Sequence, residues 1–215
     1  MTPAAGGPSS PRLLLCDLGG VLVSFSWDRA IERWSQASGV PAALISSRFD
    51  PHDDAGREFE VGRLSEAQYF DYLRRHCRLP LGDAELAQGW NEIFIEGSKS
   101  TRSVLGEVAR AGHRVVGASN TNATHEPYWR ARFAEFVCVL GTVYCSSDLG
   151  ARKPDAEFFN RVLAAEGATA RDAVLLDDTP ANVVGAKKAG LTAFVYQSAA
   201  QMARVLRQCR LLEPA

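Results

Sequence analysis

The chain has 215 residues with almost balanced charge, 24 Lys and Arg against 25 Asp and Glu. Hydrophobic residues make up 46% and charged residues 23%, ordinary globular values that exclude an intrinsically disordered chain. The charge balance gives no general attraction for nucleic acid, so we expect no nucleic-acid partner. No apolar run is long enough to span a bilayer, so we expect no membrane partner.

Short apolar runs alternate with helical patterns along most of the chain. Residues 1–10 lack a basic region followed by a long apolar stretch, so we interpret them as a flexible tail and not as a signal peptide. The apolar runs predict strands at 13–16, 114–118, 142–145, 174–176 and 192–196. Helices are predicted at 101–111, 155–166 and 180–189. Continuous apolar strands are typical of buried parallel sheets, which indicates an α/β protein with a doubly wound, Rossmann-like core over 11–23 and 99–215.

The stretch from 24 to 98 has a different pattern. It offers helical patterns at 28–38, 65–76 and 83–96 without a convincing strand between them. It directly follows the first strand, where a doubly wound sheet normally places one crossover helix. We therefore predict an inserted all-helical cap domain over the carboxyl edge of the sheet.

Polar side chains gather where the apolar runs end, and ligands of open α/β sheets bind at this edge. In chain order they are Asp17, Ser119, Asn120, Lys153, Asp177 and Asp178. Three carboxylates would repel one another without a cation, and oxygen ligands suit Mg²⁺. Lys153 and the metal would neutralise phosphate oxygens, Ser119 would donate a hydrogen bond, and Asp17 would attack phosphorus. These polar side chains together predict an enzyme that catalyses phosphoryl transfer.

Each of these features also has a purely structural explanation. An Asp after a strand is more often a turn or cap residue, the polar run 119–122 could be a loop, and Lys153 could be solvated. Asp177 and Asp178 could simply favour the start of a helix. The order and spacing of all four features together make coincidence a poor explanation.

The sequence resembles the haloacid dehalogenase-like hydrolase superfamily. The resemblance is carried by CDLGGVLV (16–23), ASNTN (118–122), ARKPD (151–155) and LLDDTPANVVGA (175–186). The segments FEVGRLSEAQYFDYL (59–73), QGWNEIF (88–94) and SSDLGARKPD (146–155) further resemble bacterial α-D-glucose-1-phosphate phosphatases. The resemblance spans nearly the whole chain, and the insert stands where that superfamily has its helical cap.

The resemblance implies roles for individual residues. Asp17 would be the nucleophile and a metal ligand, and the Gly19 carbonyl would complete its side of the Mg²⁺. Ser119 and Lys153 would hold the phosphate. Asp177 and Asp178 would bind metal directly or through water, with Asp178 the stronger candidate. Asn120 and Asn182 would support these ligands.

One position departs from many phosphatases of the superfamily. They carry a second Asp, a general acid/base, two residues after the nucleophile, where this chain has Gly19. Loss of a general acid typically costs roughly 10²–10⁴-fold in rate. Either the leaving group is acidic enough to need no donor, as in a sugar 1-phosphate, or a cap residue or water supplies the proton.

The polar, turn-rich segment 48–57 is placed to face the site from the insert. We expect His52, Asp53 and Arg57 to contact substrate hydroxyls or phosphate. The alternative is a solvated loop between cap helices.

The leading hypothesis is a Mg²⁺-dependent phosphatase for small phosphate esters, particularly sugar phosphates such as α-glucose 1-phosphate, acting through an aspartyl-phosphate. The alternatives are a 2-haloacid dehalogenase, which the acidic pair disfavours, a phosphotransferase or sugar-phosphate mutase, and a non-catalytic binding module, which only Gly19 favours. A phospho-accepting receiver domain is disfavoured because its acidic pair comes early in the chain.

The five cysteines form no CxxC motif, which favours a location in the reduced cytoplasm. We expect the protein to be a monomer or a weak homo-oligomer.

Overall fold

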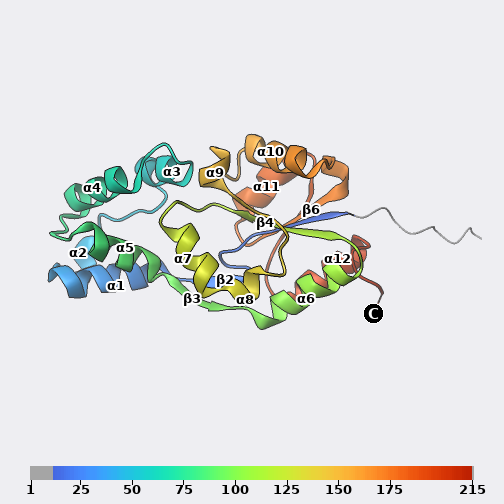
Figure 1. Ribbon diagram of the computed structural model, residues 1–215, viewed down its shortest axis with the longest axis horizontal. Coiled ribbons are helices and arrows are strands. Elements are labelled where there is room, and N and C mark those ends of the chain that lie inside the picture. Colours follow the sequence, from blue (N-terminus) through green and yellow to red (C-terminus); the bar gives the residue numbers. More distant parts are fainter. Residues whose placement is uncertain (1–11, 215) are drawn as a thin grey trace, which may run out of the picture.

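A five-stranded parallel sheet forms the centre of the molecule in a computed structural model that describes residues 12–214 (Figure 1). The predicted tail, 1–10, lies outside the described residues. The strand order is β5-β4-β1-β6-β7, and every neighbouring pair is parallel. The bounds are β1 Leu13–Cys16, β4 Arg114–Ser119, β5 Val143–Cys145, β6 Ala173–Asp177 and β7 Thr192–Val195. The sequence prediction of a doubly wound α/β core is confirmed.

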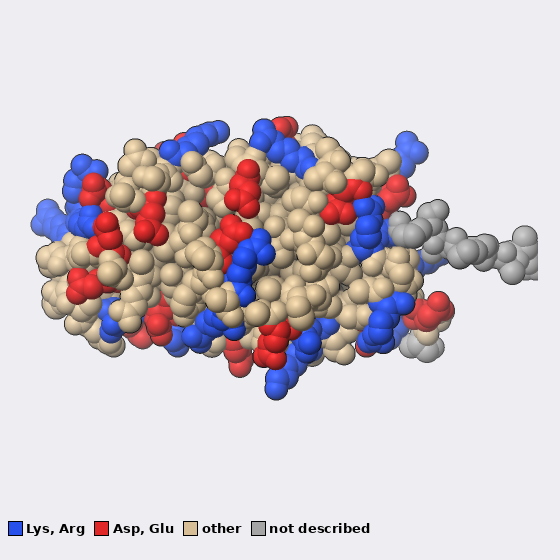
Figure 2. Space-filling view, viewed as in Figure 1, with Lys and Arg blue, Asp and Glu red and all other residues tan. Residues whose placement is uncertain are grey.

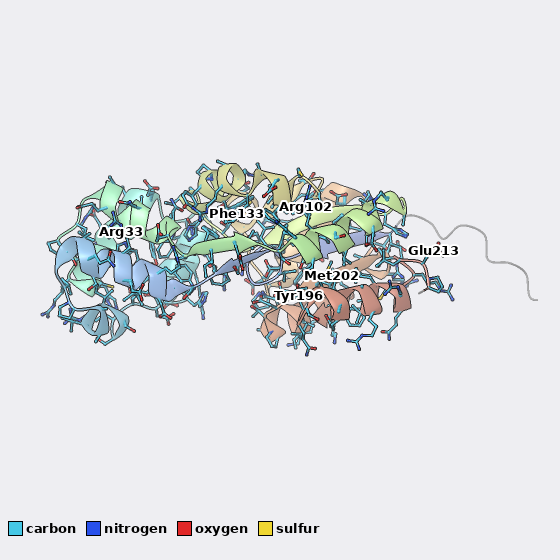
Figure 3. The ribbon with its side chains drawn as sticks, turned by 90° about the horizontal axis from the view of Figure 1, so that it is seen from below. Arg33, Arg102, Phe133, Tyr196, Met202 and Glu213 are labelled. Atoms are coloured by element: carbon cyan, nitrogen blue, oxygen red, sulfur yellow. The ribbon has the colours of Figure 1, made fainter. Side chains whose placement is uncertain are left out.

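Helices cover both faces of this sheet (Figure 1). The helices of the core are α6 Lys99–Arg110, α7 His125–Arg132, α8 Ala134–Val137, α9 Ser146–Leu149, α10 Ala156–Glu166, α11 Pro180–Lys188 and α12 Ala199–Gln208. Leu14 and Cys16 of β1 pack into one apolar cluster, and Leu13 and Leu15 pack into another on the opposite face, because successive strand side chains point to opposite sides. Seen from below, α6 with Arg102 and α12 with Met202 lie together on the first of these faces (Figure 3).

The insert between β1 and β4 has a hydrophobic core of its own, centred on buried Trp34, Tyr69 and Trp90. Its helices are α1 Trp27–Ser38, α2 Ala42–Ser46, α3 Asp54–Glu60, α4 Glu66–Cys77 and α5 Asp83–Asn91. Ser65 and Gln68 form a reciprocal capping box that defines the start of α4. These helices lie together at one end of the molecule (Figure 1).

The prediction of a strand-free insert is wrong at its two ends. β2 (Val23–Phe25) and β3 (Phe94–Gly97) pair antiparallel, so the helix predicted at 83–96 ends at Asn91. Ser26 N donates to the Ile93 carbonyl at 2.9 Å, which continues the pairing into the first helix of the insert. The two strands are too short for a clear alternation, and pairing between residues this far apart leaves no local pattern.

Acidic and basic side chains are interspersed over the face shown in Figure 2, without an area of one sign. Within residues 12–214, none of the helices has the length and apolar character needed to cross a bilayer.

Candidate active site

The strand-end residues predicted from the sequence meet at one edge of the sheet. Asp17 directly follows β1, Ser119 ends β4 and Asp177 ends β6. A cavity of about 430 Å³ lies between this edge and the insert, and its lining includes Asp17, Ser119 and Lys153. The fold therefore places these side chains under the inserted helices, where a small ligand would be enclosed.

Lys153 forms the centre of a buried charge cluster. Its Nζ lies 2.6 Å from Asp177 Oδ2 and 3.0 Å from Asp17 Oδ1, and the side chain is 1% exposed. Burial opposes the charge on Lys153, but Asp17 and Asp177 outweigh it and raise the lysine pKa. Burial, and secondly Asp177, raise the pKa of Asp17. The ammonium balances only part of the acidic charge.

Asp177 and Asp178 occupy different surroundings. Asp177 is fully buried and accepts hydrogen bonds from Asn182 Nδ2, at 3.0 and 3.1 Å, and from Thr179 N at 2.9 Å. Asp178 lines the cavity, whereas Asp177 does not. Asp177 therefore orients Lys153, and Asp178 is the member of the pair that faces the cavity. Asn182 supports Asp177, as the sequence resemblance implied for this asparagine.

The turn after β1 brings backbone close to these carboxylates. Asp17 Oδ1 accepts from Leu18 N at 2.7 Å. Gly20 has φ +72°, and a Cβ on it would lie 2.0 Å from Asp178 Oδ2. Only glycine accommodates both the backbone conformation and this approach. Gly19 lines the cavity directly.

Asn120 holds the segment that carries Lys153. Its Nδ2 donates to the Lys153 carbonyl and its Oδ1 accepts from Lys153 N, each at 2.9 Å. Such a two-way bond fixes the lysine backbone beside the sheet edge. Asn120 and buried Ser119 both line the cavity.

Two of the three residues predicted in the insert reach the cavity. His52 and Arg57 line it, whereas Asp53 does not. Asp53 is the N-cap of α3, with Oδ1 accepting from Gly56 N at 2.8 Å and Oδ2 from the Tyr72 hydroxyl. The expectation that Asp53 contacts substrate is therefore corrected: helix capping and Tyr72 occupy both of its oxygens.

The sequence reasoning missed an ion pair that joins the insert to the core. Arg152 Nε lies 2.7 Å from Glu60 Oε2, and both residues line the cavity. Ser146 Oγ also donates to the Glu60 carbonyl at 2.6 Å. Arg152 directly precedes Lys153 in ARKPD, but the sequence holds no signal that pairs it with Glu60.

The wall of the cavity is rich in aromatic side chains, namely Phe25, Trp27, Trp90, Phe94, His125 and Trp129. His125 stacks on Trp90 with ring centroids 4.9 Å apart and planes at 5°, and its Nδ1 lies 3.0 Å from Asn91 Oδ1. Burial lowers the pKa of His125 to about 3, so the ring is neutral near pH 7. Trp90 is buried at this junction of insert and core.

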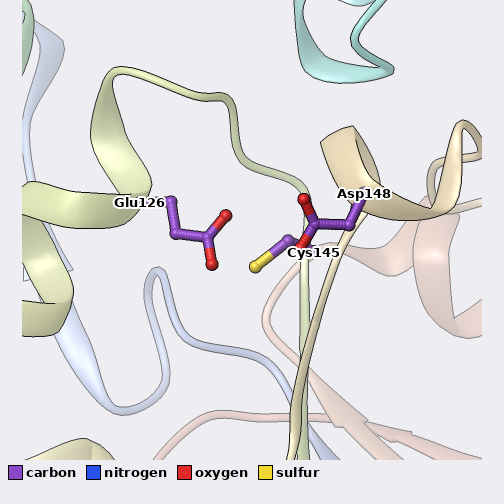
Figure 4. Close-up of side chains that lie close together, drawn as sticks. All are labelled: Glu126, Cys145 and Asp148. Carbon is purple, nitrogen blue, oxygen red and sulfur yellow. The ribbon is translucent and has the colours of Figure 1, made fainter.

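Two groups of side chains in the described part of the chain have metal-ligand spacing. Oxygens of Asp17, Asp177 and Asp178 lie within 4.8 Å of one another, and this all-carboxylate set beside the cavity fits a hard divalent cation. Glu126, Cys145 and Asp148 form the second group (Figure 4). There Arg130 Nε already neutralises Glu126 at 2.7 Å, burial raises the pKa of the Cys145 thiol, and all three residues lie outside the cavity lining. The first group is the candidate metal centre.

The sheet topology, the helical insert and this strand-edge cluster agree with a family match. A family model described as haloacid dehalogenase-like hydrolase matches residues 11–190, so the chain belongs to this family of hydrolases. Its relatives identify it more narrowly as a phosphatase-type member. It is 28% identical to a protein named as a phosphatase from Mycobacterium tuberculosis, over 86% of this chain and 87% of that protein.

A second relative agrees with this class, and a solved structure shares the fold. The D-ribitol-5-phosphate phosphatase of Bacteroides thetaiotaomicron is 25% identical over 87% of this chain and 92% of that protein. A HAD family enzyme of the same organism, solved in complex with magnesium and inorganic phosphate, superimposes with a TM-score of 0.74 at 22% identity. That comparison covers 87% of this chain and 95% of the other.

Proposed function

We propose that this hydrolase is a Mg²⁺-dependent phosphatase of small phosphate monoesters, particularly sugar phosphates such as α-glucose 1-phosphate. The observation that carries the proposal is the cluster of Asp17, Lys153 and Asp178 lining one enclosed cavity. Asp17 and Asp178, together with the Gly19 carbonyl, would hold the metal. When bound, Mg²⁺ supplies positive charge that offsets the carboxylates and the phosphate oxygens.

The chain's own residues account for the two chemical steps. Asp17 attacks phosphorus and forms an aspartyl-phosphate, and the ester oxygen leaves. Lys153 and Ser119 bind the phosphate oxygens, with Lys153 held in place by Asp177 and Asn120. Attack by water then releases phosphate and restores Asp17. Because these groups are positioned by the sheet edge before substrate arrives, little reorganisation is needed during reaction.

The insert supports a preference for small substrates. It covers the cavity, and the partly buried Arg152–Glu60 pair ties it to the core. His52 and Arg57, on the insert side of the cavity, would contact the hydroxyls of the alcohol portion. One relative is named a D-ribitol-5-phosphate phosphatase, which supports a small phosphate ester as the substrate class here.

The test is phosphate release from a panel of sugar phosphates, with and without Mg²⁺, by the wild type and by Asp17→Asn. We expect release that needs Mg²⁺, favours α-glucose 1-phosphate and disappears in Asp17→Asn. Lys153→Met provides a second variant that lacks the phosphate-binding ammonium. Release that persists in Asp17→Asn would contradict the proposed nucleophile. A folded wild type that releases no phosphate from any substrate would favour a non-catalytic binding protein.

A further inference from the structure

Phe25 is an aromatic side chain that stays 38% exposed within the wall of the active-site cavity. It belongs to β2, and its ring lies against Gly19, two residues after Asp17. A Cβ on Gly19 would lie 3.0 Å from Phe25 Cε1 and 3.3 Å from Cδ1. A side chain at residue 19 would therefore begin in close contact with this ring.

Three of the other titratable side chains around the cavity, His125, Glu60 and Asp178, are poorly suited to protonate a leaving group. Burial keeps His125 neutral near pH 7, because it lowers the pKa of this histidine to about 3. Glu60 is occupied by its ion pair with Arg152, at 2.7 Å. Asp178 belongs to the candidate metal centre. His52, exposed on the insert side, is the remaining histidine in the described lining.

We propose that Phe25 is a specificity-determining residue that places an apolar ring where a protein acid would otherwise meet the leaving oxygen. The site would then select phosphate monoesters whose leaving group is itself acidic, as in anomeric, aryl and enol phosphates. Esters of ordinary alcohols would be poor substrates. This inference rests on the proposed phosphatase function and narrows its substrate class.

The proton balance follows from this arrangement. As the Asp17 oxygen bonds to phosphorus, the bond from phosphorus to the ester oxygen breaks and its electron pair stays on that oxygen. The departing oxyanion takes its proton from water and not from the protein. Hydrolysis of the aspartyl-phosphate by a second water returns a proton to solvent, so the overall reaction consumes one ester and one water. The free-energy cost of departing as an anion is smallest for the most acidic leaving groups.

The first experiment uses the unmodified protein with Mg²⁺ and a graded series of p-nitrophenyl, phenyl and ethyl phosphate. α-Glucose 1-phosphate and glucose 6-phosphate form a matched pair, because one sugar leaves through an anomeric oxygen and the other through a primary alcohol. We expect kcat/KM to fall by about 100-fold or more from p-nitrophenyl to ethyl phosphate, the range that a missing general acid typically costs. Similar values across the series would overturn the inference while leaving the phosphatase function intact. Absence of phosphate release from every ester would instead overturn the proposed function and, with it, this inference.

The second experiment restores a carboxyl group at residue 19. We expect Gly19→Asp alone to gain nothing, because its side chain meets the Phe25 ring. Gly19→Asp combined with Phe25→Ala should raise the ratio of ethyl to p-nitrophenyl phosphate hydrolysis by about 10-fold or more over Phe25→Ala alone. No rise in a folded double variant would count against the proposed role of Phe25. A loss in His52→Gln that is selective for ethyl phosphate would identify His52 as the donor and overturn the proposal, whereas an equal loss on both esters would agree with the proposal and with a role of His52 in substrate binding.

Discussion

The ion pair between Glu60 and Arg152 gives the sharpest test of how the insert is held on the core. Glu60→Gln keeps the shape of the side chain but removes its charge, leaving the guanidinium of Arg152 without its partner. The two side chains are 13% and 18% exposed, and the charged atoms lie 2.7 Å apart. Breaking a fully buried pair typically costs ~3–5 kcal/mol, and an exposed pair contributes ~0.2–1 kcal/mol.

The small remaining exposure places this pair nearer the buried limit, so we expect Glu60→Gln to lower the free energy of unfolding by about 2–3 kcal/mol. For a chain of this length that corresponds to a Tm lower by about 4–12 °C. Arg161 and Glu157 provide a matched control, with Nε and Oε1 2.8 Å apart but side chains 47% and 57% exposed. Glu157→Gln should cost less than about 0.5 kcal/mol.

A double-mutant cycle separates the pairwise interaction from other effects of each substitution. The assay is urea unfolding of the wild type, Glu60→Gln, Arg152→Gln and the double variant, with the same four proteins for Glu157 and Arg161. We expect a coupling free energy of at least about 1 kcal/mol for the first pair. Coupling as small in the first pair as in the exposed control would refute the reasoning that burial strengthens this contact.

The remaining predictions concern burial, backbone conformation and capping. Because the pKa of His125 is lowered from 6.5 to about 3, the unfolded chain binds a proton that the folded chain does not between these pH values. Stability should therefore fall as the pH drops from 6.5 toward 3, and His125→Phe should make this fall shallower in a pH series of melting curves. Gly20→Ala should abolish most activity, because its Cβ would meet Asp178. The control is Gly39→Ala, also at φ +72° but with open space around it. It should lower the free energy of unfolding by only ~1 kcal/mol and keep activity. Asp53→Ala should lower stability by about 1 kcal/mol, measured by urea unfolding, and leave the ranking of substrates unchanged. A changed ranking of substrates would indicate that Asp53 contacts the substrate after all.

Asp17, Ser119 and Asp177 were predictable because each lies at the end of a continuous apolar strand, whereas Lys153 lies in the loop after α9. Leu13, Leu14 and Leu15 are fully buried, and the polar residue after them is Asp17. The same pattern precedes Asp177. Parallel strands bring their carboxyl ends to one edge, so local hydrophobic patterns were enough to predict which side chains meet.

The different roles of Asp177 and Asp178 were not predictable in this way. Asp177 and Asp178 are adjacent in sequence and chemically identical. Only the direction of each side chain separates the fully buried partner of Lys153 from the cavity-lining Asp178. That direction is set by Asn182 and the start of α11, whose contacts with Asp177 depend on how the helix packs against the sheet.

The sequence by itself determined the parallel sheet, the position of the insert and the polar residues at the strand ends, because strand burial and helix periodicity are recorded in neighbouring residues. Tertiary structure alone decided that β2 pairs with β3, that Phe25 covers Gly19 and that Glu60 reaches Arg152. The last two residues are 92 positions apart, and their contact depends on how the insert packs on the core. Local propensity carries no information about such pairs, since their free energy comes from burial shared between distant segments.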